Sequence, residues 1–150
     1  MPVIKNTILI KAPIEVCFDL ARNVEVHTRT TEKTKEKAVG GVTTGLLKEG
    51  DTVEWEAVHF SIKQRLTAKI TEMNRPYEFK DIMVKGAFKS FNHTHTFAPS
   101  GNETVMTDRF EYQSPLGCIG KAADLLFLER YMKNFLSDRA KELKKTAEAK

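Results

Sequence analysis

The sequence predicts an α+β protein in which an antiparallel sheet is covered by one long C-terminal helix. Three observations predict this class: apolar residues alternate with polar ones in several consecutive segments, short turns join those segments, and a three- and four-residue apolar periodicity dominates the C-terminus. A sheet with one apolar face needs a covering layer, and only the C-terminal helix is large enough to provide it. We therefore expect a hollow where a curved sheet closes around this helix.

The N-terminal elements follow from a β-branched run and two helix-start signals. Residues 3–10 are apolar and β-branched, which predicts a strand. Pro13 suits the first turn of a helix, and Asn23 can cap a second short helix from residue 24 to about residue 29. The first helix carries an apolar stripe formed by Ile14, Cys17, Phe18 and Ala21.

The middle of the chain predicts a meander of antiparallel strands. A weak strand candidate covers residues 34–39, and the glycine-punctuated loop after it ends at residues 49–51. Lys85-Gly86 predicts a tight connection, and residues 99–102 predict a four-residue turn. The strands expected around these turns cover residues 52–60, 61–71, 77–84, 87–97 and 103–113.

The C-terminal helix is predicted from Leu125, Leu128, Met132 and Leu143, which recur at helical spacing. We expect it to run from about residue 118 to about residue 147. At 1.5 Å per residue such a helix is about 40 Å long, enough to cross a curved sheet.

The length and composition indicate one ordinary globular domain. A chain of 150 residues buries about 68–70% of the surface of its unfolded form, which suffices for one hydrophobic core. Hydrophobic residues make up 41% and charged residues 29%, a balance typical of soluble proteins. No apolar run approaches the roughly 18–20 residues of a membrane helix, and no basic-then-apolar signal segment opens the sequence. We therefore expect one domain over residues 1–150, a cytoplasmic location and no stable membrane insertion.

The charge and the cysteines predict neither a nucleic-acid partner nor a metal or disulfide. The net charge is +4, and the C-terminal Lys141 and Lys145 alternate with acidic residues such as Glu142, as on a solvated helix face. Cys17 and Cys118 are far apart and have no CxxC spacing, so we expect free thiols.

Polar residues recur on strand faces that alternation predicts to be dry. Buried ionisable groups are costly unless they are paired or solvated, so these residues predict a wet cavity or a paired network. The polar residues on the inner faces are His59, Gln64, Asp81, His93, His95 and Asp108.

The predicted turns set a strand register. A turn over residues 99–102 places His93 directly opposite Asp108 and His95 opposite Met106. The connection at Lys85-Gly86 places Phe79 near His93, with Asp81 as a diagonal neighbour. The expected result is a polar cluster of Asp81, His93 and Asp108 among the aromatic residues Phe79, Phe91 and Phe110.

Three interpretations of this cluster remain open. It is a satisfied buried His–Asp pair that fixes strand register, a polar anchor for an otherwise apolar ligand, or a centre of acid–base or metal chemistry. The HxH spacing of His93 and His95 is a weak metal signal without further ligands. No nucleophile, zinc-protease or nucleotide-binding motif stands beside it.

Other residues have simpler structural interpretations. Trp55, on an inner face, is core or a platform for a ligand. His27 is expected to be an ordinary half-exposed residue of the second short helix, and residues 28–37 a solvated turn and edge strand. Leu128 packs helix against sheet, and Tyr131 and Met132 can reach the cavity.

Several residue patterns along the chain match one known family. They are Ile10, Ala12, Pro13 and Phe18, the run Gly50-Asp51-x-Val53-x-Trp55-x-Ala57-x-His59-Phe60, the residues Phe79, Asp81, Met83, Gly86 and Phe88, then Phe91, His93, His95 and Phe97, and Pro115-Leu116-Gly117 before the C-terminal helix. With these patterns the chain resembles the SRPBCC superfamily, the START-like and birch-pollen-allergen-like helix-grip proteins, in its polyketide cyclase/dehydrase or ligand-binding branch. The resemblance covers almost the whole chain.

The resemblance implies a helix-grip fold: a curved seven-stranded antiparallel sheet around the C-terminal helix, with two short N-terminal helices and a deep cavity. Our first hypothesis is a protein that binds a lipid, polyketide or aromatic metabolite without a cofactor or metal, as a monomer or weak homodimer. The alternative is a cyclase/dehydratase-type enzyme in which His93, polarised by Asp108, removes one proton while Asp81 or Tyr112 supplies another. A third hypothesis is a partner-binding module that uses the basic end of the C-terminal helix. The candidate ligand-binding residues are Trp55, His59, Gln64, Leu66, Phe79, Asp81, Phe91, His93, His95, Asp108, Phe110, Tyr112, Leu128 and Met132.

Overall fold

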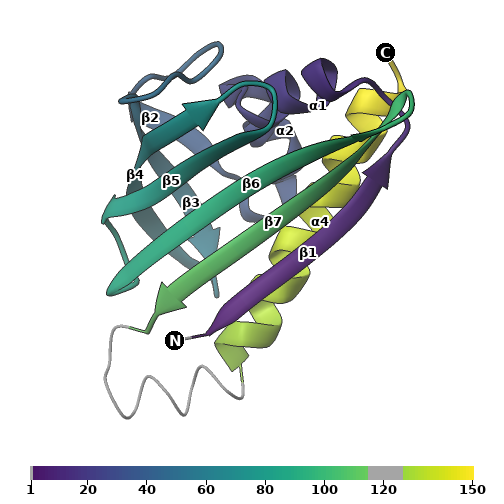
Figure 1. Ribbon diagram of the computed structural model, residues 1–150. Coiled ribbons are helices and arrows are strands. Elements are labelled where there is room, and N and C mark those ends of the chain that lie inside the picture. The colour runs from purple at the N-terminus through teal and green to yellow at the C-terminus, as the bar shows by residue number, and fades with distance from the viewer. Residues whose placement is uncertain (1, 115–126) are drawn as a thin grey trace.

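The structure is a computed structural model that describes residues 2–114 and 127–150. Its described residues form one seven-stranded antiparallel sheet in the order β1-β7-β6-β5-β4-β3-β2, which bends around the C-terminal helix (Figure 1). The predicted α+β class and antiparallel arrangement are confirmed. The strands are β1 (Val3–Ile10), β2 (Lys37–Gly41), β3 (Thr52–His59), β4 (Ile62–Asn74), β5 (Glu78–Lys85), β6 (Ser90–Ser100) and β7 (Glu103–Gln113).

Three α-helices and a 3-10 turn lie on the same side of the described sheet (Figure 1). Asn23 caps the second helix as predicted, because its side chain accepts a hydrogen bond from the Val26 backbone N–H at 3.0 Å. The predicted helical stretch 118–126, with Cys118 and Leu125, lies outside the described residues. The helical elements are α1 (Ile14–Ala21), α2 (Val24–Thr30), η1 (Glu32–Thr34) and α4 (Glu129–Glu148).

The space between sheet and helices is filled at one end. There Phe18 of α1 packs edge-on against Phe79 and Phe97, with ring centroids 5.4 and 5.3 Å apart. The thiol of Cys17 is free and buried in the same cluster. A second apolar cluster, around Phe91 and the first half of α4, lies farther along the sheet. The N-terminal helices therefore close one end, and any ligand space must lie toward the other.

The register between β6 and β7 differs by two residues from the prediction. The turn has two residues, Gly101-Asn102, so that His95 lies opposite Asp108 and His93 opposite Phe110. Gly101 has a φ of +64°, the conformation that glycine supplies at the first turn position of a type II′ hairpin. The expected direct pairing of His93 with Asp108 was therefore wrong, and His95 takes that place.

The connection between β5 and β6 is longer than predicted. It covers residues 86–89 instead of Lys85-Gly86, and it places Asp81 opposite His93 and Phe79 opposite His95. Phe88, expected in a strand, turns inward from this loop and packs against Phe91 at 6.1 Å. Phe88 is partly buried there and lines the cavity described below.

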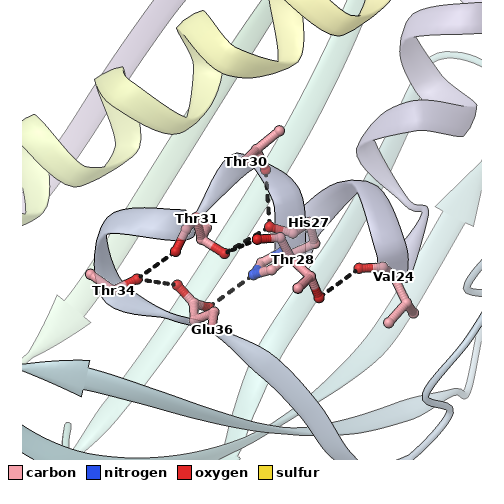
Figure 2. A network of polar contacts seen from close by, with 7 residues as sticks. All are labelled: Val24, His27, Thr28, Thr30, Thr31, Thr34 and Glu36. Atoms are coloured by element: carbon pink, nitrogen blue, oxygen red, sulfur yellow. Dashed lines mark hydrogen bonds and ion pairs between the residues drawn. The ribbon is translucent and has the colours of Figure 1, made fainter.

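The segment after α2 is not the solvated turn that the sequence predicts. Thr30, Thr31, Thr34 and Glu36 are buried, and residues 32–34 form a 3-10 turn. The strand expected over residues 34–39 covers Lys37–Gly41 instead. Threonine hydroxyls bond to nearby backbone carbonyls along this segment, as Figure 2 shows. Local side-chain bonding of this kind satisfies a buried backbone without a sheet partner.

Candidate ligand-binding site

A cavity of about 290 Å³ lies between α4 and the inner face of strands β3 to β7. On the helix side, its wall is built by Leu128, the residue before α4, and by Tyr131, Met132, Phe135, Leu136 and Arg139 of α4, a spacing of i, i+3, i+4, i+7, i+8 and i+11. Such spacing places all six on one helix face. The sheet contributes mainly aromatic and aliphatic side chains, so the cavity suits a small molecule with an apolar body.

Most residues predicted to bind a ligand line this cavity, and four do not. Phe79 and His95 lie behind its inner end, and Asp108 lies behind His95. Tyr112 is fully buried in the apolar cluster around Phe91. The predicted residues that line the cavity are Trp55, His59, Gln64, Leu66, Asp81, Phe91, His93, Phe110, Leu128 and Met132.

The outer end of the cavity reaches the surface at the β3–β4 hairpin. Phe60, Arg65 and Ala87 line the cavity and are exposed. Phe60 has a φ of +54° in the two-residue turn and packs against Tyr131, with ring centroids 4.5 Å apart. Tyr131 also bonds to His59 Nδ1 at 2.5 Å. Burial lowers the pKa of His59 below its usual range, so this histidine is neutral near pH 7.

A buried His–Asp cluster backs the inner end of the cavity. His95 donates from Nε2 to Asp81 Oδ2 at 2.9 Å and from Nδ1 to Asp108 Oδ1 at 3.0 Å. His93 donates from Nε2 to the same Asp108 oxygen at 3.2 Å, and the two imidazole rings lie 3.8 Å apart. The three predicted cluster residues are thus brought together, with His95 at the centre.

The environment gives the two histidines different charges. Burial alone would lower the pKa of His95, but hydrogen bonds to Asp108 and Asp81 raise it above its usual value. Burial and the neighbouring charge of His95 lower the pKa of His93. Although burial would raise the pKa of Asp108, its two histidine partners hold that pKa far below the usual range. At neutral pH the carboxylates are therefore ionised, while His95 is the more readily protonated histidine and His93 is neutral.

A second buried pair, formed by His27 and Glu36, was missed by the sequence analysis. His27 Nε2 donates to Glu36 Oε1 at 2.9 Å, and the other carboxylate oxygen accepts from Thr34 at 3.2 Å (Figure 2). The His27 ring stacks on Trp55, with centroids 4.0 Å apart. Burial, reinforced by the charge of Arg139, lowers the pKa of His27. The pair thus supplies an ionised carboxylate and a neutral imidazole at the cavity.

Different signals were available for the missed residues. Arg139 follows Met132 by two helical turns, so the cavity-facing periodicity already includes its position. Glu36 lies in a run of charged residues, and nothing in that run distinguishes it from its exposed neighbours. Its burial depends on the fold of the η1 turn.

Asp81, His93 and His95 together offer a carboxylate and two imidazoles of the kinds that bind metal ions. One ligand atom from each lies within 4.8 Å of the others, and two histidines with a carboxylate are a set that transition metals accept. Both ring nitrogens of His95 are already bonded to carboxylates. A metal ion would have to displace the proton from His95 Nε2, so the arrangement as it stands is a hydrogen-bonded network.

Comparison with known proteins agrees with this architecture. Residues 1–148 match the family described as "Polyketide cyclase / dehydrase and lipid transport". The chain belongs to this family. Membership in the polyketide cyclase/dehydrase and lipid transport family confirms the resemblance found in the sequence. Family and fold together suggest a protein that binds a hydrophobic ligand.

Solved structures similar to this family member share its helix-grip fold. A protein from Thermus thermophilus is 19% identical, with a TM-score of 0.81, and 99% of this chain and 98% of that chain are covered. A START superfamily protein from Mycobacterium smegmatis is 12% identical, with a TM-score of 0.76 and coverages of 98% and 97%. The ginseng major latex-like protein 151 from Panax ginseng is 16% identical, with a TM-score of 0.73 and coverages of 97%. At these identities the likeness establishes the fold alone.

No protein of curated function matches the sequence. Among the helices in residues 2–114 and 127–150, none is long and apolar enough to cross a membrane.

Proposed function

We propose that this protein binds a small, largely apolar molecule, such as a lipid, polyketide or aromatic metabolite, in the cavity between the sheet and α4. The observation that carries the proposal is an apolar cavity of about 290 Å³ whose inner end holds ionisable groups. Pockets for small molecules combine apolar walls with a few placed polar groups. The family's description, which includes lipid transport, supports the same assignment.

The two parts of the wall have different roles in this proposal. Apolar burial contributes about 25 cal/mol per Å² to binding, before the entropic cost of association is subtracted. The polar groups fix which end of the molecule enters first. His93 and Asp81 are the predicted residues available for this orienting role, because they line the cavity at its buried end.

Trp55 provides an intrinsic probe for the test, because it lines the cavity and is the single tryptophan of the chain. Titration with decanol, a flavonoid and a polyketide should change Trp55 emission with dissociation constants in the micromolar range or tighter. Native mass spectrometry of the freshly purified protein should also reveal a co-purified small molecule. Absence of any binder in that range would count against the proposal.

Filling the cavity should weaken ligand binding while leaving the fold intact. Ala57 is buried and lines the cavity, so Ala57→Phe should weaken decanol binding at least about tenfold. Ala98 lies on β6, is exposed and does not line the cavity, so Ala98→Phe is the matched control. Ala68→Leu gives a milder obstruction if the first variant unfolds. Wild-type affinity in both folded cavity variants would refute the proposed location.

A second candidate function, acid–base catalysis of the cyclase/dehydratase type, is favoured by the position of His93. His93 lines the cavity, is neutral near pH 7, and its Nε2 is held by Asp108. A neutral imidazole held in this way can accept a proton from a bound substrate. The structure argues against the predicted acids, because Asp81 is ionised and Tyr112 does not line the cavity.

The two functions are separated by His93→Ala. If the protein is an enzyme, this variant should lose turnover of a polyketide substrate by about 10²- to 10⁴-fold, with ligand affinity largely kept. The measurement is product formation and binding on the same sample. An equal loss of both would favour binding alone.

A further inference from the structure

We propose that Arg139 forms an anion subsite at the inner end of the cavity, so that the bound molecule carries a carboxylate or an equivalent anionic oxygen group. The inference rests on the proposed binding function and narrows it to acidic apolar molecules. Arg139 is not among the ligand-binding residues predicted from the sequence.

Arg139 makes no hydrogen bond or close ion pair with any residue that the structure describes. It is only partly exposed and lines the main cavity. A guanidinium has five N–H donors in a planar fork, and leaving them unpaired next to apolar walls is unfavourable. A ligand carboxylate matches this fork with two parallel hydrogen bonds.

The neighbouring carboxylates are already bonded to other residues. Asp81 accepts from His95, and Glu36 accepts from His27 and Thr34. The charge of Arg139 helps to keep the pKa of both acids low, yet neither lies close enough for an ion pair. Arg139 therefore balances their charge from a distance while its donors remain available.

The position of Arg139 also sets the orientation and length of the ligand. Leu128, the residue before α4, and Arg139 both line the cavity, and eleven helical steps of 1.5 Å separate them, about 16 Å along the helix axis. Apart from the Tyr131 hydroxyl, which is bonded to His59, the cavity-lining side chains between them are apolar. Two smaller cavities, of about 20 and 50 Å³, also have Arg139 in their walls. An apolar chain of about ten carbons can lie along this wall with its acidic group innermost.

The test compares ligands of one chain length on the wild-type protein. Decanoate, methyl decanoate, decanol and decylamine differ in the head group alone, and calorimetry gives the affinity of each. Decanoate should bind at least about tenfold more tightly than decanol, the weak end of what a charged hydrogen bond contributes. Equal affinities for decanoate and decanol, or tightest binding of decylamine, would overturn the anion subsite while leaving the binding function intact. If none of the four ligands binds, both the anion subsite and the proposed binding function are refuted.

Substitution of Arg139 assigns the preference to this residue. Arg139→Met should remove the preference for decanoate and leave decanol affinity within about twofold, and Arg139→Lys should retain part of the preference. Arg130 lies on the same helix but is exposed and does not line the cavity, so Arg130→Met should behave as the wild type. A purely structural role for Arg139 would lower thermal stability without changing the decanoate-to-decanol ratio, and an unchanged ratio in folded Arg139→Met refutes the assignment.

Discussion

Replacing Asp108 by asparagine will lower the free energy of unfolding by about 3–5 kcal/mol, because it removes the charged acceptor of a buried network and leaves its histidine partners in place. Asp108 accepts hydrogen bonds from both His93 and His95 and is 7% exposed. The measurement is urea denaturation of variant and wild type. Asp138→Asn is the control, because Asp138 pairs with Lys33 at an exposed site and should change stability by less than about 1 kcal/mol. If Asp108→Asn lowers the free energy of unfolding by no more than Asp138→Asn does, the His–Asp network does not stabilise the fold as proposed.

The effect of Asp108→Asn should depend on pH. The pKa of Asp108 is lowered on folding, so its contribution is complete above the ordinary value of 3.8 and is lost as the pH falls toward the folded value. The pKa of His95 is raised, so its contribution is complete below 6.5 and is lost as the pH rises through the folded value. The stability difference should therefore be largest between these two ordinary values and shrink at alkaline pH.

Leu136→Ala should both destabilise the protein and enlarge its ligand space. Leu136 is 3% exposed and lines the cavity, and truncation of a buried leucine costs about 2–5 kcal/mol. An apolar ligand that carries one more methyl branch than the wild-type cavity accepts should fill the space left by the leucine. Its binding should restore part of the lost stability, which is measured as an increase in melting temperature when the ligand is added.

The control for Leu136→Ala is Leu9→Ala, because Leu9 is 43% exposed on β1. This variant should change stability by less than about 1 kcal/mol and should not alter ligand size preference. An unchanged ligand preference in Leu136→Ala would show that this side chain does not limit the cavity.

The strands and helices were predictable because local periodicity decides them, whereas the register was not. Alternation places His93 and His95 on the inner face whatever the register. Whether Met106 or Asp108 lies opposite His95 depends on the length of the turn between β6 and β7. Pro99 suggested a four-residue turn, but the turn consists of Gly101 and Asn102 alone. A slip by two residues keeps every side chain on its face while exchanging its partners.

The candidate site was predictable only where it lies on regular elements. Strand residues such as Trp55 and His93 were found because the sheet determines where they point. Glu36 and His27 meet through a buried turn whose geometry depends on tertiary packing, so sequence spacing gave no indication of their pairing. The role of the whole set in ligand binding stays a prediction.

The pairing of β1 with β7 constrains the order in which this protein folds. Thr7 and Thr107 are neighbours across these strands although one hundred positions separate them in the chain. The β3–β4 and β6–β7 hairpins close short loops and can form early, whereas β1 must wait for a partner that is synthesised much later. We expect the first strand to dock last, so that during translation its apolar residues remain accessible to chaperones until β7 has emerged from the ribosome.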